Sequence, residues 1–210
     1  MAGMMKTGEI VHEMASQPMI LTDQIDQGWL MGALRRPSPN YNARPDPDDL
    51  SLLVIHNISL PPGRFGGKQV EQLFCNCLDW SEHPFFETIQ GLEVSSHLFI
   101  RRDGEVIQFV PFHERAWHAG RSEFQGRGNC NDFSIGIELE GTDDAPYESV
   151  QYDQLVQVTC ALMQAYPAIT LDRIVGHCDI APGRKTDPGP YFDWDYYRAA
   201  VTRGLTPVSI

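Results

Sequence analysis

Residues 97–110, HLFIRRDGEVIQFV, limit the fold more than any other segment, because they have the pattern of two strands joined by a tight turn. Asp103 and Gly104 stand at the centre, and Asp-Gly between two strand-like runs is among the strongest hairpin signals. A hairpin places antiparallel pairing in whatever sheet the chain forms. Any such sheet that also contains parallel strands is therefore mixed.

Three further segments have the length and pattern of strands. Residues 51–56 (SLLVIH) form an apolar run that stops at a polar loop, and residues 173–177 (RIVGH) form a shorter one. In residues 133–141 (FSIGIELEG), apolar positions alternate with Gly136, Glu138 and Glu140, which is the period of a strand. This alternation places the three residues on one face, and Gly136 predicts open space beside Glu138.

Helical spacing occurs between these strands, at residues 68–80, 83–92, 149–166 and 192–204, and Gly204 is placed to end the last helix. The mixture of strands and helices predicts an α/β fold, a single domain with a central mixed β-sheet flanked by helices. Residues 1–26 are predicted to be a polar N-terminal extension and residues 27–210 the domain. In sheets of this kind the chemistry usually lies at the strand ends.

Charge and composition argue against several classes of function. The 210 residues carry a formal net charge of −12, whereas nonspecific nucleic-acid binding needs a basic face. No apolar run approaches the roughly 20 residues of a membrane span. Residues 1–24 lack the basic start and apolar core of a signal peptide, and the five cysteines fit neither a disulfide framework nor a zinc ribbon. These features predict a cytoplasmic protein with reduced thiols that binds neither nucleic acid nor membrane.

Two of the seven histidines, His56 and His177, each end a strand-like run and precede a polar loop. Their imidazoles converge if both strands end at the same edge of the sheet. Asp187 follows in the Gly- and Pro-rich segment 176–190, GHCDIAPGRKTDPGP, whose composition argues against a helix interior. Two histidines and a carboxylate are a common ligand set for catalytic zinc, with the fourth position left for water. Asp179 competes as the third ligand, but its place two residues from His177 favours a hydrogen bond to the local backbone.

Glu138 and Lys185 are the candidates for the chemistry beside such a metal. Glu138 lies among apolar neighbours, where a carboxylate is costly unless it has a function or a partner, and it is the candidate proton shuttle. Lys185 or Arg184 offers positive charge opposite an oxyanion. The structural alternatives are a buried salt bridge for Glu138 and a solvated loop charge for Lys185. Two histidines and an aspartate also meet by chance in many chains, so spacing alone leaves both interpretations open.

Four segments together resemble the AmpD family of cytoplasmic 1,6-anhydro-N-acetylmuramyl-L-alanine amidases: LLVIHNISLPPGRFGG, SSHLFIRRDGEVIQFVPFHERAWHAG, CNDFSIGIELEGTD and GHCDIAPGRKTDPGPYFDW. The resemblance runs over residues 29–201 and implies the fold of type 2 amidases and peptidoglycan-recognition proteins. It makes residues 27–210 a zinc amidase domain and implies that His56, His177 and Asp187 hold Zn²⁺.

The same resemblance implies Glu138 and Lys185 as the catalytic pair. It implies Asn57 and Trp117 as substrate contacts, and Arg184 is expected to bind substrate beside them. The family's substrates are anhydromuropeptides from cell-wall turnover, which are cut at the amide between the lactyl carboxyl group and L-Ala. No obligate protein partner is expected, and in some bacteria loss of the activity raises β-lactamase expression.

Two residues depart from the family pattern, because Glu93 and Asn129 stand where an arginine is common. Both changes remove positive charge from places expected to face the substrate. Two rival functions are a module that binds peptidoglycan without cutting it and a periplasmic amidase acting on intact wall. The complete set of predicted ligands disfavours the first, and the lack of a signal sequence disfavours the second.

Overall fold

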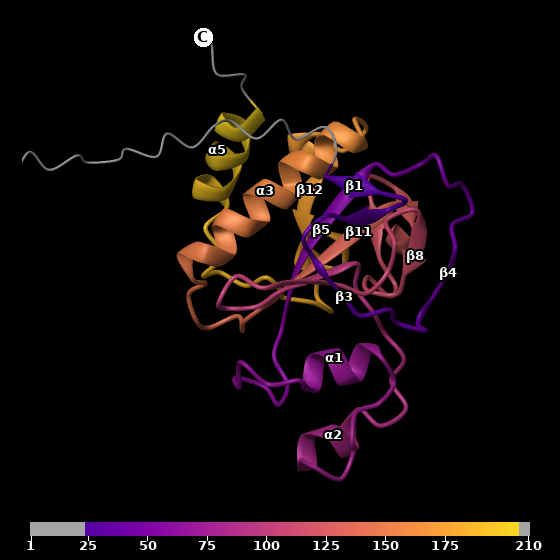
Figure 1. The fold of residues 1–210 in the computed structure, drawn as a ribbon, viewed down its shortest axis with the longest axis vertical. Helices are drawn as coiled ribbons and strands as arrows, with labels where there is room; N and C mark the ends of the chain where they lie inside the picture. Colours follow the sequence, from indigo (N-terminus) through magenta and orange to yellow (C-terminus); the bar gives the residue numbers. More distant parts are fainter. Residues whose placement is uncertain (1–23, 206–210) are drawn as a thin grey trace, which may run out of the picture.

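Six strands form the central sheet of the computed structural model, which describes residues 24–205 (Figure 1). Their order is β12, β5, β11, β6, β7 and β3, and they span Ile174–Gly176, Leu52–Ile58, Ser134–Glu140, Leu98–Ile100, Val106–Gln108 and Leu34–Arg35. Every neighbouring pair is parallel except β6 and β7, which are antiparallel. This pair is the hairpin predicted around Asp103 and Gly104, so the prediction of a mixed sheet is confirmed.

Helices flank the sheet, as the sequence predicts. They are α1 (Gln69–Phe74), α2 (Pro84–Thr88), α3 (Ser149–Ala165), α4 (His177–Ile180) and α5 (Trp194–Leu205), with 3₁₀ helices η2 (Cys130–Asp132) and η3 (Leu171–Arg173). Three short antiparallel pairs complete the described fold: β1 (Ile25–Asp26) with β2 (Trp29–Leu30), β4 (Tyr41–Ala43) with β8 (Glu114–Ala116), and β9 (Glu123–Phe124) with β10 (Arg127–Gly128). In Figure 1, α3 and α5 lie side by side along one side of the sheet, and α1 and α2 lie together at the lower end.

The parallel strands at the centre of the sheet are buried on both faces. On one face, Leu53 and Ile55 of β5 belong to the cluster that α3 and α5 cover. On the other face, Leu52 and Val54 belong to a second cluster, beneath the loops that precede β11. Strands covered on both sides read as continuous apolar runs, which explains the SLLVI pattern. Because side chains alternate along a strand, His56 lies on the same face as Leu52 and Val54.

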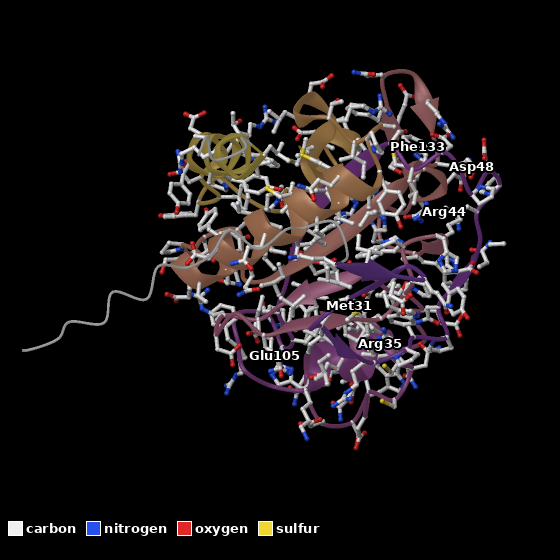
Figure 2. The ribbon with its side chains drawn as sticks, turned by 45° about the horizontal axis from the view of Figure 1, so that its top comes forward. Met31, Arg35, Arg44, Asp48, Glu105 and Phe133 are labelled. Atoms are coloured by element: carbon white, nitrogen blue, oxygen red, sulfur yellow. The ribbon has the colours of Figure 1, made fainter. Side chains whose placement is uncertain are left out.

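A buried arginine anchors the start of β11. Arg44 is only 6% exposed, and its guanidinium donates hydrogen bonds to the carbonyls of Asn131, Asp132 and Ser134, around Phe133 (Figure 2). Burial lowers the pKa of Arg44 to about 10, which still leaves the group charged at neutral pH. The arginine therefore fixes the loop that leads into the strand carrying Glu138.

Two helix ends differ from the sequence prediction. The helix predicted over residues 68–80 ends at Phe74, and the chain turns into the left-handed region at Asn76, where φ is 56°. The last helix continues through Gly204, which was expected to end it. A Cβ atom at Gly204 would lie 2.8 Å from Sγ of Cys160 on α3. This glycine therefore permits close packing of two helices.

Most of the predicted N-terminal extension, residues 1–23, lies outside the described residues. Its last two residues, Ile25 and Asp26, form β1. Across residues 24–205, no helix combines the length and the apolar character that crossing a membrane requires. All five cysteines fall within this part of the chain and are free thiols.

Candidate metal centre

The C-terminal ends of three neighbouring parallel strands meet at one edge of the sheet. In the register of β5 and β11, His56 lies opposite Glu138, and β12 is aligned so that Gly176 lies opposite Ile55. His177 follows Gly176 directly, as the first residue of α4. His177, His56 and Glu138 therefore stand in a row across the three strands, which is the arrangement that brings the two imidazoles together.

Three potential metal-binding atoms converge at this edge. Nδ1 of His56 lies 2.9 Å from Nδ1 of His177 and 3.1 Å from Oδ2 of Asp187. Nδ1 of His177 lies 3.0 Å from the same carboxylate oxygen. Both imidazoles are buried, and the Asp187 side chain is 13% exposed. Among the described residues, this is the group of His, Cys and carboxylate side chains placed to share one metal ion.

The surroundings determine which of these atoms present lone pairs. Nε2 of His177 lies 3.1 Å from the carbonyl oxygen of Ala119, which only accepts, so Nε2 carries the proton and Nδ1 presents a lone pair. Burial lowers the pKa of His56 to about 4, so this imidazole is neutral at pH 7. Burial raises the pKa of Asp187, but the adjacent imidazoles of His177 and His56 lower it by more, so the net pKa lies below its ordinary value. Neutral imidazoles and an ionised carboxylate are the forms that bind a metal, so the donor set fits a divalent cation.

Asp179 lies in the same segment but has another role. Its Oδ2 accepts a hydrogen bond of 2.7 Å from the backbone N–H of Gly176, which caps the single turn of α4. The segment was expected to exclude helix, yet its first residues form this turn, because the proline and positive-φ glycine positions begin only at Pro182 and Gly183. The local role predicted for Asp179 is confirmed, although the bond runs back along the chain.

Two side chains form hydrogen bonds with the backbone next to Asp187. The Tyr147 hydroxyl donates a hydrogen bond of 2.7 Å to the carbonyl of Pro188, and the Asn57 amide donates to the same carbonyl at 3.1 Å. The Asn57 amide also donates to Oδ1 of Asp143 at 2.8 Å. Asn57, predicted as a substrate contact, therefore has a structural role as well. Tyr147 had no signal in the sequence, because its partner lies 41 residues away.

A cavity of about 590 Å³ opens over this edge of the sheet. Its polar and aromatic lining includes Asn57, Trp117, His118, Glu138, His177, Arg184, Lys185 and Asp187. Its apolar lining includes Leu60, Leu73, Phe74, Phe85, Ile89, Leu92 and Val94, mainly from α1 and α2 and the residues that follow them. All the residues predicted for the site thus line this cavity except His56, whose Nδ1 lies 2.9 Å from Nδ1 of the lining residue His177.

Glu138 is the unsatisfied carboxylate of the site. Its Oε2 is buried and makes no hydrogen bond with the protein. Burial raises the pKa of Glu138 well above its ordinary value, the negative charge of Asp187 adds to this, and Lys185 opposes it. The structural alternative of a buried salt bridge is not observed at this residue. A buried carboxylate without a partner, beside a metal-binding trio, is placed to bind a molecule in the cavity.

Trp117 and Arg184 line the cavity, but their side chains also form hydrogen bonds with the protein. The Trp117 indole N–H donates to Oδ1 of Asn42 at 2.7 Å. The Arg184 guanidinium donates to the carbonyls of Ala119 and Arg121, both at 2.7 Å. Their contact with a substrate remains a prediction, and for Arg184 the same bonds hold the 119–121 loop.

Glu93 and Asn129, the two departures from the family pattern, are both exposed. Neither is among the residues that line the cavity, although Leu92 and Val94 on either side of Glu93 are. Among the described residues, Arg184 and Lys185 are the arginine and lysine side chains at the cavity wall. Both positive side chains of the wall therefore come from the segment that carries Asp187.

Gly136 does not leave open space beside Glu138, contrary to the sequence prediction. A Cβ atom at this position would lie 2.4 Å from Cγ of His118, because the imidazole of His118 lies directly over the glycine. His118 lies on the side of His56 that faces away from the trio, and it also lines the cavity.

Comparison with known proteins agrees with this geometry. The family model described as N-acetylmuramoyl-L-alanine amidase, Amidase_2, matches residues 46–190. The 1,6-anhydro-N-acetylmuramyl-L-alanine amidase AmpD of Escherichia coli K12 is 58% identical over 182 residues, which cover 87% of this chain and 99% of the relative. A crystal structure of a selenomethionine AmpD derivative has a TM-score of 0.82 at 59% identity, covering 84% of this chain and 98% of that one.

A more distant structure holds a ligand. It is the complex of the Escherichia coli N-acetylmuramyl-L-alanine amidase AmiD with the substrate anhydro-N-acetylmuramic acid-L-Ala-D-gamma-Glu-L-Lys, similar at a TM-score of 0.53 and 31% identity. That match covers 72% of this chain and 57% of the AmiD chain. The resemblance and the fold expected from the sequence are both confirmed. The chain belongs to the Amidase_2 family of N-acetylmuramoyl-L-alanine amidases and, within it, to the AmpD branch.

Proposed function

We propose that this chain is a zinc-dependent amidase that hydrolyses the amide bond between the lactyl group of 1,6-anhydro-N-acetylmuramic acid and L-Ala in muropeptides. The observation that carries the proposal is the convergence of His56, His177 and Asp187, of which the last two line one cavity together with Glu138. The AmpD relative is named for this bond, and the AmiD complex holds a substrate of this class. The activity belongs to cell-wall recycling, and the proposed location is the cytoplasm, with which five free thiols agree.

Zn²⁺ is the metal that suits this donor set. Catalytic zinc sites use three protein ligands from histidine and carboxylate side chains and keep a fourth position open. Here His56, His177 and Asp187 would hold the ion. When bound, zinc acts as a Lewis acid and lowers the pKa of bound water toward about 7.

Glu138 carries the proton through the reaction. It takes a proton from the attacking water as the water oxygen bonds to the lactyl carbonyl carbon. It then delivers that proton to the L-Ala nitrogen as the carbon–nitrogen bond breaks, leaving a lactyl carboxyl group and a free amine. A carboxyl group with a raised pKa suits both halves of this transfer. Its buried Oε2, which has no protein partner, is available to bond the water.

Lys185 stabilises the negative charge that develops on the carbonyl oxygen. Its side chain lies at the cavity wall with those of Glu138 and Asp187. Arg184, Asn57 and Trp117 are proposed to contact the substrate around this centre. Arg184 and Lys185 provide positive charge at the cavity wall for the carboxylates of the stem peptide, which a chain of net charge −12 would otherwise repel.

Replacing Lys185 with alanine is expected to lower kcat by about 10²–10³, because one oxyanion contact is lost. The melting temperature should change little, since Lys185 is exposed. Lys68→Ala is the matched control, because Lys68 is also exposed but is absent from the cavity wall. Steady-state kinetics on an anhydromuropeptide measure both variants, and a near-normal kcat for Lys185→Ala would refute its role.

The activity itself is tested by product analysis. The purified chain is incubated with anhydromuramyl-tripeptide, with and without a chelator, and the products are identified by mass spectrometry. The expected products are anhydro-N-acetylmuramic acid and free tripeptide, formed only when metal is present. Intact sacculi provide the comparison, since equal cleavage of sacculi would favour a wall-degrading amidase. Binding of the muropeptide without any cleavage would favour a recognition module.

A further inference from the structure

A second histidine lies behind His56, on the side away from the metal-binding trio. Nε2 of His56 is 2.9 Å from Nδ1 of His118, and Nε2 of His118 is 3.1 Å from the hydroxyl oxygen of Ser134. All three side chains are buried, with His118 9% exposed. The two rings meet edge to face, with centroids 5.0 Å apart. The three residues thus form a hydrogen-bonded row that leads from the trio into the protein.

Only one proton can lie between the two imidazoles, and its position decides whether His56 can bind a metal. If the proton is on Nε2 of His56, this histidine donates to His118, and its Nδ1 presents a lone pair to the trio. His118 then carries its own proton on Nε2 and donates to Ser134. If His118 donates from Nδ1 instead, neutral His56 carries its proton on Nδ1. That proton would point at His177 and Asp187 and would block a cation.

The protein holds His118 in place from two further sides. Its backbone N–H and that of Ala119 donate to Oδ1 of Asn131, at 3.1 and 2.8 Å. Its ring lies over Gly136, where a Cβ atom would come within 2.4 Å. Ser134 and Gly136 precede Glu138 on the same face of β11, so one strand provides the acceptor for His118, the space for its ring and the proposed proton shuttle.

We propose that His118, bonded to Ser134 and lying over Gly136, is a positioning residue that fixes the tautomer of His56 and thereby sets the metal affinity of the site. The inference rests on the proposed metal centre, and it adds a residue that lines the cavity without being one of the three proposed metal ligands. In metal sites, loss of such an outer partner typically weakens metal binding by about 10–100-fold.

Two substitutions of His118 separate this role from simple packing. The side-chain oxygen of asparagine takes the position of Nδ1 and can still accept from His56, whereas the amide of glutamine reaches the position of Nε2 beside Ser134. Zinc affinity is measured by competition with a chromophoric chelator. His118→Gln is expected to bind zinc about 10–100-fold more weakly than wild type, and His118→Asn is expected to retain most of the affinity. Wild-type affinity in His118→Gln, or an equal loss in both variants, would overturn the proposal.

Ser134 offers a second test with a close control. Ser134→Ala removes the acceptor for His118 and is expected to weaken zinc binding by about tenfold. Ser38→Ala removes another buried hydroxyl, which donates to the carbonyl of Phe74, and is expected to leave zinc affinity unchanged. Equal zinc affinities in the two alanine variants would contradict the role given to Ser134.

The tautomers can also be measured in the wild-type protein, so this test does not depend on the folding of a variant. Long-range ¹⁵N–¹H correlation spectra of the zinc-loaded chain are expected to show His118 and His56 both protonated at Nε2. A proton on Nδ1 of His118 would overturn the inference. If wild type itself binds no zinc, the proposed function fails. If wild type binds zinc and the spectra or His118→Gln disagree, only the positioning role fails.

Discussion

Replacing Asp187 with alanine is expected to remove the tightly bound metal and to reduce hydrolysis of anhydromuropeptide to the level of chelator-treated wild type. The change leaves His56 and His177 facing one another at 2.9 Å without the ionised group that attracts a cation between them. Catalytic zinc sites rely on three protein ligands, so a pair of neutral imidazoles is insufficient. Metal content per chain after dialysis and steady-state rates measure the two effects. One tightly bound zinc ion in this variant would refute the ligand set.

The melting temperature provides an independent measure of the same site. A metal at 100 times its Kd stabilises the folded state by about 2.7 kcal/mol, which corresponds to roughly 5–10 °C for a chain of this size. Chelator is therefore expected to lower the Tm of wild type by this amount and to leave that of Asp187→Ala unchanged.

Asp179→Ala is the matched control for this experiment, because it removes a carboxylate from the same segment. Asp179 caps α4 through the N–H of Gly176 and takes no part in the trio. The variant is expected to retain zinc and its response to chelator, and to lose about 1 kcal/mol of stability with the cap. Loss of zinc from Asp179→Ala alone would reverse the assignment of the two carboxylates.

The strand pattern was sufficient to bring His56 and His177 together, because their positions follow from where two apolar runs end. Parallel neighbours in one sheet place such ends at one edge, and the observed register does so. The importance of Glu138 was also predictable, since a buried glutamate needs a function or a partner, but its lack of a partner was not, because Glu140 in the same alternation accepts two backbone N–H groups. These features depend on residues close in sequence and on general rules of sheets.

The supports behind the site were not predictable, because they depend on contacts between distant segments. Gly136 suggested a gap, but the ring of His118 from the loop that begins at Trp117 fills it. The carbonyl of Pro188 accepts a hydrogen bond from Tyr147, and nothing in the sequence around Tyr147 indicates this partner. The local pattern predicts the face of the strand to which a side chain points. The residue that packs against that side chain comes from a distant segment and depends on the packing of the whole chain.

Replacing Glu138 with glutamine is expected to lower kcat by about 10²–10⁴, the usual contribution of a general acid or base. The metal content should remain at one zinc ion per chain, since Glu138 is outside the trio. Glutamine has nearly the same shape as glutamate but cannot take up the proton of the attacking water. Single-turnover rates, together with metal analysis, measure the effect. Activity near that of wild type would assign the proton transfer to another residue.

Glu140 is the control for this substitution, because it is a second buried glutamate on the same face of β11. Its two carboxylate oxygens accept the backbone N–H groups of Gly66 and Arg102, at 2.5 and 3.1 Å. Glu140→Gln is therefore expected to cost about 1–3 kcal/mol of stability while keeping most of the activity. Glu138→Gln should therefore lower catalysis, whereas Glu140→Gln, two residues away, should lower stability.

The pH dependence of stability in metal-free protein tests the state of Glu138 without any substrate. Burial and the charge of Asp187 raise its pKa well above the ordinary value near 4.5. The folded chain then keeps a proton that the unfolded chain has released, so this group lowers the stability as pH rises from about 4.5 through the raised pKa. Glu138→Gln removes this loss, because its side chain does not ionise.

The Tm of Glu138→Gln minus that of wild type is therefore expected to increase with pH, by roughly 2–4 °C for each kcal/mol of charge burial that is relieved. Any constant cost of burying the glutamine amide appears equally at every pH and does not affect the slope. A difference that is flat from pH 4 to pH 9 would mean that the folded protein ionises Glu138 as readily as the unfolded chain does. If the difference does increase with pH, the residue that lowers the stability of the metal-free fold is also the one that transfers the proton, which is the relation expected when a carboxylate is kept unpaired for catalysis.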